Sequence, residues 1–523
     1  MNPDHMKRPN FLLIITDQHR ADHLGCYGNS ILKTPAIDAI ATEGVCFDRF
    51  YVTSAICQPN RATLMTGRPP SLNGVRHNGI ALSLDAVTFV ERLRESGYRT
   101  ALVGKSHLQN MTDRPALIAG GKGEALRRHG GRYDQEISTQ WKNPQHDLDY
   151  PYYGFETCDL ANDHSDQVEG HYSRWLAERH PDPDSLRGPR NALSNEGADL
   201  PQAWRTRMPE ELYPTTYVAE RTIARIEELS AQPERPFFLK CSFPDPHHPF
   251  TPPGRYWDLY RAADMPLPDA WHVDTGRLPP HVRHLFQERD SGTAKKDTPA
   301  LFACNEHETR ALIALTYGMI AMIDDAIARI LAALEKAGTA RDTIVIFTSD
   351  HGDLMGDHQL MLKGPVHYQG VVRVPFIWRE TAERRVRGRR PGLAATIDIA
   401  RTILDRAGVE PFNGMQGVSQ LPVIAGTAPS PRAAALIEEE GQRTYMGFPS
   451  RIRMRTLVTA QHRLSLYEGV DWAELYDLQD DPLEMRNLWD DPAAADLQRE
   501  MLERLAREMI ASSETSPAPT GLA

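Results

Sequence analysis

The chain has 523 residues, of which 41% are hydrophobic and 25% charged, the balance of a globular protein with a sizeable core. Its formal net charge of −11 argues against binding to a phosphate backbone as the main task, so we expect no nucleic acid partner. We see no stretch approaching the roughly 20 apolar residues of a membrane span, and the apolar run 11–15 is too short for a signal-peptide core. We therefore expect a cytoplasmic protein with reduced cysteines and no membrane partner.

Predicted strands and helices alternate along most of the chain. Apolar runs predict strands at 10–16, 45–52, 98–103, 236–243 and 343–348, and helices are predicted from Pro35 to the stop at Gly44 and at about 85–96, 215–229 and 308–337. Alternation of this kind is typical of a mainly parallel sheet with helices on both faces. Sites in such sheets lie beyond the carboxyl ends of strands, where Asp17, Lys105, 244–248 and Asp350 fall.

We divide the chain into a catalytic α/β domain at 1–425, a C-terminal subdomain at 426–512 and a tail at 513–523. The catalytic domain contains two long polar insertions, at about 109–208 and 251–306, which we interpret as lids or specificity segments. Short β-prone runs and a terminal helix predict antiparallel sheet and helix in the C-terminal subdomain. The small, polar tail is expected to be disordered. Because the terminal helix and tail could reach a neighbouring subunit, we expect a homo-oligomer.

The most specific motif is the segment 57–67, CQPNRATLMTG. It resembles the C-x-P-x-R signature of the sulfatase family, in which a formylglycine-generating enzyme oxidises the cysteine to formylglycine. The resemblance implies that hydrated, oxidised Cys57 is the nucleophile and that Arg61 holds its oxygens or their metal-bound neighbours. A helix N-terminus at Cys57 would stabilise an alkoxide. Taken alone, so short a match fits a buried structural cysteine equally well.

A second motif strengthens the resemblance. Residues 97–107, GYRTALVGKSH, resemble the family pattern G-x-x-[TS]-A-x-x-G-K-x-H. The resemblance implies that Lys105 binds the transferring anion and the nucleophile's oxygen. It further implies that His107 is the base that collapses the covalent intermediate.

Asp17, Asp350 and His351 match the family's metal-ligand positions, with the oxygen of modified Cys57 completing the shell. We expect one divalent cation, Ca²⁺ or Mn²⁺, since carboxylates suit both and an imidazole shifts the preference toward a transition metal. Typical sulfatases carry Asp and Asn where this chain has Gln18 and His351. That combination resembles the phosphonate monoester hydrolase and choline sulfatase branches of the family.

Three further positions match substrate contacts of the family. His247, in the sequence PHHPF at 246–250, matches the leaving-group contact better than its neighbour His248 does. Lys363 matches a lysine that meets the substrate anion. Asn78, like Gln18, matches a polar substrate contact in the phosphonate branch, although Asn-Gly is also a common turn signal.

The resemblance implies an alkaline-phosphatase-like α/β fold with a large, mainly parallel mixed sheet and a smaller C-terminal α+β subdomain. The implied activity is hydrolysis of a small anionic ester, a sulfate monoester as in arylsulfatases. The nearest alternative is a phosphonate monoester or phosphodiester hydrolase using the same site. A two-zinc phosphatase would need more His and Asp ligands than the sequence places. A catalytically silent binding protein would lack the metal and keep Cys57 unmodified.

Overall fold

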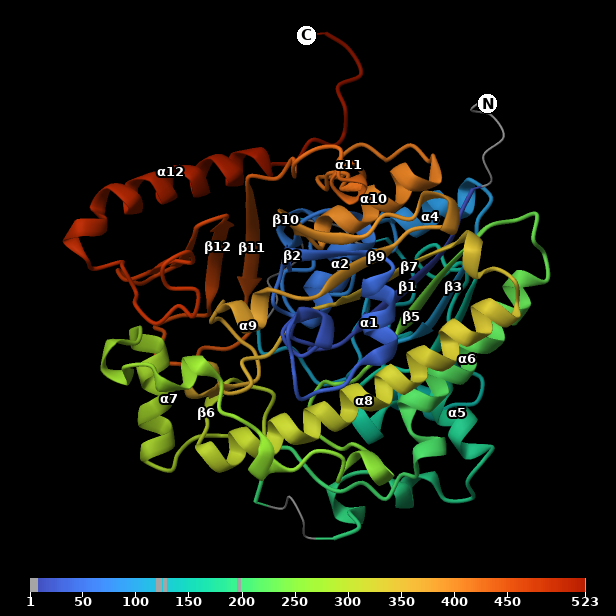
Figure 1. Ribbon diagram of the computed structural model, residues 1–523, viewed down its shortest axis with the longest axis horizontal. Helices are drawn as coiled ribbons and strands as arrows, with labels where there is room; N and C mark the ends of the chain where they lie inside the picture. The colour runs from blue at the N-terminus through green and yellow to red at the C-terminus, as the bar shows by residue number, and fades with distance from the viewer. Residues whose placement is uncertain (1–7, 119–124, 126–128, 195–198, 523) are drawn as a thin grey trace.

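The computed structural model describes residues 8–118, 125, 129–194 and 199–522. Within them, an eight-stranded mixed sheet of order β10-β2-β9-β7-β1-β5-β3-β4 forms the centre of the molecule (Figure 1). Its strands are β1 (Asn10–Thr16), β2 (Val45–Tyr51), β3 (Arg99–Gly104), β4 (Thr157–Leu160), β5 (Phe237–Ser242), β7 (Thr343–Ser349), β9 (Phe376–Arg379) and β10 (Gly388–Ala395).

The sheet is mainly parallel. The strand β1 pairs in parallel with β5 and β7, and β3 pairs in parallel with β4 and β5. Only β9, among the described strands of this sheet, runs antiparallel to its neighbours β2 and β7. The parallel strands therefore direct their carboxyl ends to one edge, as the sequence predicts.

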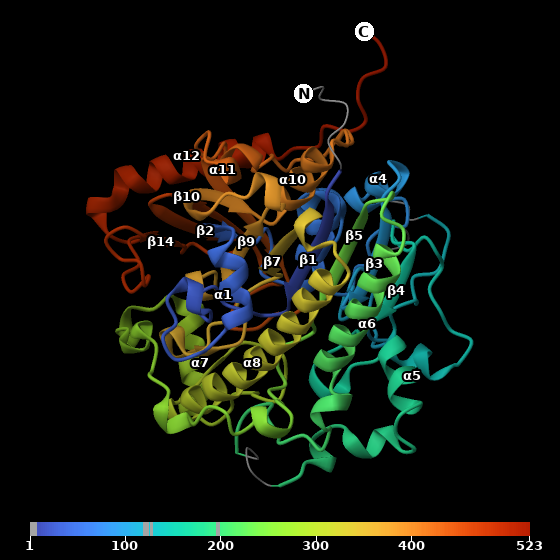
Figure 2. The same cartoon turned by 45° about the vertical axis from the view of Figure 1, so that its right-hand side comes forward.

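Helices cover both faces of the sheet, as successive side chains of β1 show. One face of β1 carries Phe11, Leu13 and Ile15, which pack toward α2 (Cys57–Thr66), α4 (Phe89–Glu95) and α10 (Ile397–Ala407). The opposite face carries Leu12 and Ile14, which pack toward α1 (Pro35–Thr42), α6 (Pro214–Ser230) and α8 (Glu306–Lys336). Figure 2 shows α8 running diagonally beside α6 across their face. The predicted fold class is confirmed.

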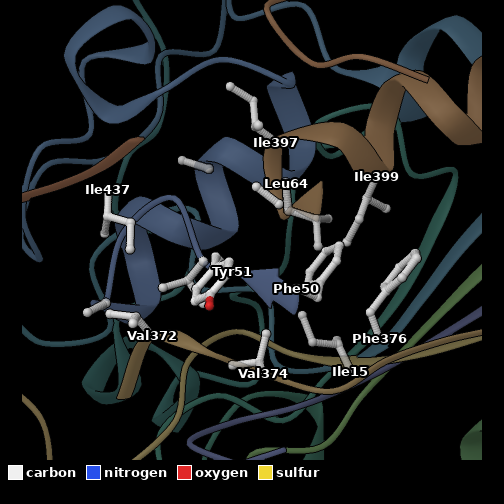
Figure 3. Packing of buried hydrophobic residues seen from close by; sticks show 14 of the residues in the cluster. Ile15, Phe50, Tyr51, Leu64, Val372, Val374, Phe376, Ile397, Ile399 and Ile437 are labelled. Carbon is white, nitrogen blue, oxygen red and sulfur yellow. The ribbon is translucent and has the colours of Figure 1, made fainter. Parts of the chain in front are cut away.

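The core behind α2 is tightly packed. Figure 3 shows Leu64 of α2 and Ile399 of α10 against Phe50 of β2, and Phe50 stacks on Phe376 of β9 with ring centroids 4.2 Å apart. Every residue of α2 is buried, whereas a surface helix would expose one face. The motif that begins at Cys57 is thus fixed by packing on all sides.

The C-terminal subdomain is an antiparallel sheet of order β11-β12-β13-β14 covered by one helix. Its elements are β11 (Ala434–Glu440), β12 (Arg453–Thr459), β13 (His462–Tyr467), β14 (Glu474–Asp477) and α12 (Ala495–Ala511). Met501 and Leu505 of α12 pack on the sheet. In the tail, the carbonyls of Ser513 and Thr515 accept hydrogen bonds from Gln416 and Asn413, so residues expected to be disordered contact the catalytic domain. The division near residue 425 stays a prediction.

Several elements differ from the sequence predictions. The helix expected from 85 begins at Phe89, because Thr88 accepts a hydrogen bond from the Glu91 amide and caps it. The insertions expected to be irregular contain β4 and α5 (His171–Ala177) in the first and α7 (Pro280–Asp290) and β6 (Phe302–Ala303) in the second. Other strands and helices not predicted are β9 and β10 in the main sheet, and α3 (Pro70–Asn73), β8 (Leu360–Met361), α9 (Gln369–Val372), α10 and α11 (Leu421–Ala425).

One described helix, α8, is long and apolar enough to cross a membrane by length and composition, contrary to our reading of the sequence. However, 89% of its most apolar window is buried inside the protein. Its apolar character is accounted for by the core it forms with α1 and α6.

Candidate active site

The predicted site residues meet at the carboxyl-terminal edge of the main sheet. Asp17 follows β1, Lys105 follows β3, and Asp350 and His351 follow β7. The peptide N–H of Asp17 donates to the carbonyl of Asp245, which lies just beyond β5. Four strand ends thus bring together residues that are far apart in sequence.

Asp17, Cys57, Asp350 and His351 form one buried cluster whose potential ligand atoms all lie within 4.8 Å of one another. The Cys57 Sγ is 3.0 Å from His351 Nε2 and 3.8 Å from Asp17 Oδ1. Two carboxylates, an imidazole and the residue-57 side chain are a donor set suited to a divalent cation. The residues present therefore fit the metal ion that the sequence implies.

Cys57 is the first residue of α2, and the N-cap residue Ile56 makes no side-chain hydrogen bond to this helix end. The positive end of the helix dipole there favours negative charge on the residue-57 side chain. The neighbouring amide of Gln58 donates to Asn78 Oδ1 over 3.2 Å, so Asn78 lies beside this end of the helix with an exposed side chain. Its predicted contact with substrate stays a prediction.

Arg61 lies one turn further along α2 and is completely buried. Its Nε is 2.7 Å from Asp350 Oδ2, and its Nη2 is 3.6 Å from Asp17 Oδ2. Its Nη1 donates to the Lys105 carbonyl and to Ser242 Oγ. Arg61 therefore contacts both carboxylates of the cluster, and its predicted role of holding the neighbours of a metal ion stays a prediction.

Lys105 is completely buried, and its Nζ forms an ion pair with Asp17 Oδ2. The preceding Gly104 has φ 97°, and a Cβ there would lie 1.8 Å from the Ser242 carbonyl oxygen. Only glycine fits at this point, so β3 can pass close to β5 and direct the next residue into the site.

His107 is 5% exposed, and its Nδ1 has no hydrogen-bond partner among the described residues. Burial, followed by the charges of Lys105 and Arg61, holds the pKa of His107 well below its ordinary value. The imidazole is therefore neutral at neutral pH and able to accept a proton.

Lys363, His247 and Gln18 form a second group of contacting side chains in the site. The Lys363 Nζ is 2.7 Å from His247 Nε2 and donates to Gln18 Oε1 over 2.8 Å. The His247 Nδ1 bonds the carbonyl of His248, so Nδ1 carries the proton and Nε2 accepts from the lysine. Burial is the largest cause that holds the pKa of His247 well below its ordinary value.

The charges of the site shift the pKa values of the central cluster. Burial and Asp17 raise the pKa of the Cys57 thiol, but Lys363, His351 and Lys105 outweigh them and the pKa is lowered. Burial also raises the pKa of Asp17, yet Lys105 and other cations hold it well below its ordinary value. The surrounding cations thus favour the anionic forms of Asp17 and Cys57.

Sequence reasoning missed His164, Asp353 and the part played by His248. The His164 Nε2 is 2.6 Å from Lys105 Nζ, and its ring stacks on that of His247 with centroids 3.7 Å apart. Asp353 is 1% exposed and accepts from the Gln18 amide, which also contacts His248 Nδ1. The position of Asp353, three residues after the predicted metal ligand Asp350, could have indicated it. No sequence pattern indicated His164, which lies within the first long insertion.

The comparisons with known proteins show which family the chain resembles over most of its length. The family model "Sulfatase" matches residues 9–409, and the model "N-sulphoglucosamine sulphohydrolase, C-terminal" matches residues 356–511. The sulfatase YidJ of Escherichia coli is 30% identical over 506 residues, which cover 96% of this chain and 87% of that protein. An arylsulfatase of Clostridium perfringens is 28% identical, with 92% and 90% covered.

Among solved structures, the phosphonate monoester hydrolase of Agrobacterium radiobacter superposes with a TM-score of 0.77 at 25% identity. The alignment covers 99% of this chain and 98% of that protein. The sheet, its helices and the C-terminal subdomain therefore have the alkaline-phosphatase-type fold of the sulfatases. With a family model that spans most of the chain and the two motifs on one buried cluster, the protein belongs to the sulfatase family of hydrolases.

Proposed function

We propose that this protein hydrolyses sulfate monoesters at the cluster around Cys57. The proposal rests on one observation: three buried cations, Arg61, Lys105 and Lys363, lie around that cluster. They offset the negative charge of a sulfate group as its ester bond breaks. The two lysines come from different parts of the chain, since Lys105 follows β3 and Lys363 follows β8.

When present, the metal ion and the hydrated aldehyde of oxidised Cys57 supply Lewis-acid charge and an attacking hydroxyl. The chain's own residues then have separate tasks. Arg61 keeps the carboxylates of Asp17 and Asp350 directed at the cluster. Lys363, held by His247 Nε2 and Gln18 Oε1, places an N–H group and a positive charge beside the substrate oxygens.

His107 and His247 divide the proton handling. The neutral His107, with its free Nδ1, accepts a proton on the Lys105 side of the site. His247 cannot donate from Nδ1 to substrate, because that proton is bonded to the His248 carbonyl. Its assistance to the leaving alcohol therefore passes through Lys363, whose ammonium group it contacts.

A second candidate is hydrolysis of phosphonate monoesters or phosphodiesters at the same site. The observation that favours it is the position of Gln18, a neutral amide between Lys363 and Asp353 where typical sulfatases have a carboxylate. The similarity to the phosphonate monoester hydrolase structure agrees with it. The pair Lys105 and His107, which follows the sulfatase pattern, favours the sulfate ester.

Turnover of an aryl sulfate and an aryl phosphonate monoester, compared side by side with Cys57→Ala as the inactive control, tests the proposal. A higher kcat/KM for the sulfate is expected. A higher kcat/KM for the phosphonate would replace the first candidate with the second.

The proposal also covers the metal ion, the oxidation of Cys57 and the location of the protein in the cell. We infer that the ion is Mn²⁺ rather than Ca²⁺, since His351 adds an imidazole to the cluster, and metal analysis of the purified protein tests this. Peptide mass spectrometry of the segment 57–67 shows whether a formylglycine-generating enzyme has converted Cys57. No disulfide joins the cysteines among the described residues, which supports a cytoplasmic location, and localisation of the tagged protein tests this.

We also propose a homo-oligomer. Met509 and Ile510, at the end of α12, are 48% and 73% exposed. Apolar side chains at the surface of a terminal helix suit a contact with a second copy. Light scattering after size-exclusion chromatography measures the mass directly, and a monomer at working concentration contradicts this part of the proposal.

A further inference from the structure

Glu136 lies in the first insertion and is completely buried, directly beneath the loop that follows Lys105. We propose that Glu136 is a positioning residue, which fixes Lys105 and His107 for the proposed reaction without touching the substrate. Its carboxylate accepts hydrogen bonds from three successive backbone amides and two side chains. The donors are the amides of His107, Leu108 and Gln109, the Asn162 side-chain amide and the Tyr152 hydroxyl.

The three amides converge on the carboxylate at 2.7 Å from His107, 2.9 Å from Leu108 and 3.2 Å from Gln109. Successive N–H groups that point to one side form a concavity for an anion. His107 has φ 55°, a left-handed backbone conformation that is unfavourable for a residue with a Cβ. An unfavourable conformation persists only where the surroundings compensate for it, and here Glu136 provides the compensation.

Within the described part of the chain, both oxygens of Glu136 have only donors as hydrogen-bond partners. Oε2 accepts from His107 and Asn162, and Oε1 accepts from Leu108, Gln109 and Tyr152. A glutamine in this place would turn an NH₂ group toward at least two other donors. Because every partner donates, the position requires a carboxylate and not merely a side chain of this size.

Asn162 extends the arrangement to a second loop of the site. Its Nδ2 donates to Glu136 over 2.8 Å, and its Oδ1 accepts from the amide of Ser106 over 3.0 Å. His164, two residues further along, contacts Lys105 and stacks on His247. Glu136 therefore joins the loop that carries Lys105 and His107 to the loop that carries His164.

The first insertion, interpreted from the sequence as a lid or specificity segment, therefore also holds Lys105 and His107 in place. Loss of the carboxylate should let the loop after β3 relax toward an ordinary backbone conformation and displace both side chains. A displacement of about 1 Å at a reaction centre lowers the rate roughly 100-fold. We expect that loss mainly in kcat for the sulfate ester, with metal content and Cys57 conversion unchanged.

The test compares Glu136→Gln with Asp159→Asn. Asp159 is also a buried carboxylate, on β4, but its ion-pair partners are Arg221 and Arg225 of α6 and not groups of the loop after β3. For each variant we would measure kcat and KM, the inhibition constant of inorganic sulfate, thermal stability, and hydrogen exchange of peptides covering 105–109. Only Glu136→Gln should lower kcat about 100-fold, weaken sulfate inhibition and speed exchange in that segment.

Wild-type kcat and wild-type exchange in Glu136→Gln would overturn the inference. Equal losses of kcat in both variants would also overturn it, since they would reflect stability alone. If Glu136→Gln does not fold, Glu136→Asp, which keeps the charge but shortens the side chain, takes its place with the same expected directions. If the wild-type protein cleaves neither ester, the proposed function fails, while faster exchange of 105–109 still supports the positioning role and unchanged exchange contradicts it.

Discussion

Cys57 has two properties that set its part in the reaction: it begins α2 and it lies within the cluster of potential metal ligands. A side chain that can be esterified but cannot release the ester by collapsing to an aldehyde should react once. We therefore expect Cys57→Ser to accumulate one covalent sulfate per protein without sustained turnover. Intact-protein mass spectrometry after incubation with an aryl sulfate measures the adduct. Continuous turnover by the serine variant would contradict the proposed chemistry.

At the residue scale, sequence motifs indicated the groups that lie close together along the chain. Cys57 and Arg61 share one helix, and Lys105 and His107 share one loop, so local spacing carries their relationship. His164 and Glu136 could not be found in this way. Their positions depend on how the first insertion folds back on β3, which is a non-local property that no short pattern encodes.

Asn60 anchors α2 through four hydrogen bonds. Its Oδ1 accepts from the amides of Thr53 and Ser54, and its Nδ2 donates to the Asp350 carbonyl and to Thr396 Oγ1. Replacement by alanine leaves several buried groups without a partner, so we expect Asn60→Ala to lower the free energy of unfolding by about 2–4 kcal/mol. Denaturant unfolding measures the change.

The matched control for that measurement is Asn305→Ala. Asn305 is the N-cap of α8, where its side chain accepts from the Glu308 amide. Loss of this cap should lower the free energy of unfolding by only about 1 kcal/mol. If the two alanine variants unfold alike, the four hydrogen bonds of Asn60 do not anchor α2 more strongly than a single cap anchors α8.

Asp324 of α8 is 2% exposed and accepts hydrogen bonds from the amides of Ala36 and Ile37 at the start of α1. Burial raises the pKa of Asp324 to about 6, above that of an aspartate in the unfolded chain. The unfolded state therefore releases this proton first as pH rises, so Asp324 lowers the free energy of unfolding between about pH 4 and 6, by up to roughly 1.4 kcal/mol per pH unit.

Asp324→Asn should remove that part of the pH dependence, which thermal unfolding at several pH values between 4 and 6 measures. Asp325→Asn serves as the control, since Asp325 is 57% exposed and pairs with Arg255 on the surface. An unchanged slope in Asp324→Asn would show that the carboxyl group titrates at its ordinary pKa in the folded protein.

At the element scale, the strands that frame the site were predicted because each is a continuous apolar run buried on both faces, as β1 and β7 are. The strand β9 escaped prediction because it has four residues, too few to show a period. The strand β10 begins with the exposed, charged residues of Gly388–Ala395 and carries no apolar pattern until its end. Pairing with β2, not local composition, makes it a strand.

On the scale of the whole molecule, Arg463 connects the C-terminal sheet to the catalytic domain through its ion pair with Glu484. It is completely buried and pairs with Glu474 and Glu484, and Glu484 also accepts from the amide of Gln369 at the start of α9. Arg463→Met leaves two buried carboxylates without their cation, so we expect a loss of about 3–5 kcal/mol in the free energy of unfolding.

Urea unfolding followed by tryptophan fluorescence and by activity measures that loss. In the control, Arg453→Met, the arginine is 52% exposed and pairs with Glu468 at the surface, so a change of less than about 1 kcal/mol is expected. Equal stability of the two variants would show that the buried arginine does not fasten the sheet.

The position of β1 between β5 and β7 has a consequence for the synthesis of the protein. Gln18 and Asp350, whose contact closes the cluster, are 332 residues apart. At ~5–20 residues per second, a ribosome needs roughly 20–70 s to make the chain between them. From its own synthesis until Asp350 has been made, the segment around Cys57, 2% exposed once folded, cannot yet be enclosed. The proposed oxidation of Cys57 therefore has a limited time before the chain folds, and slower synthesis of the region after β3 should raise the fraction converted.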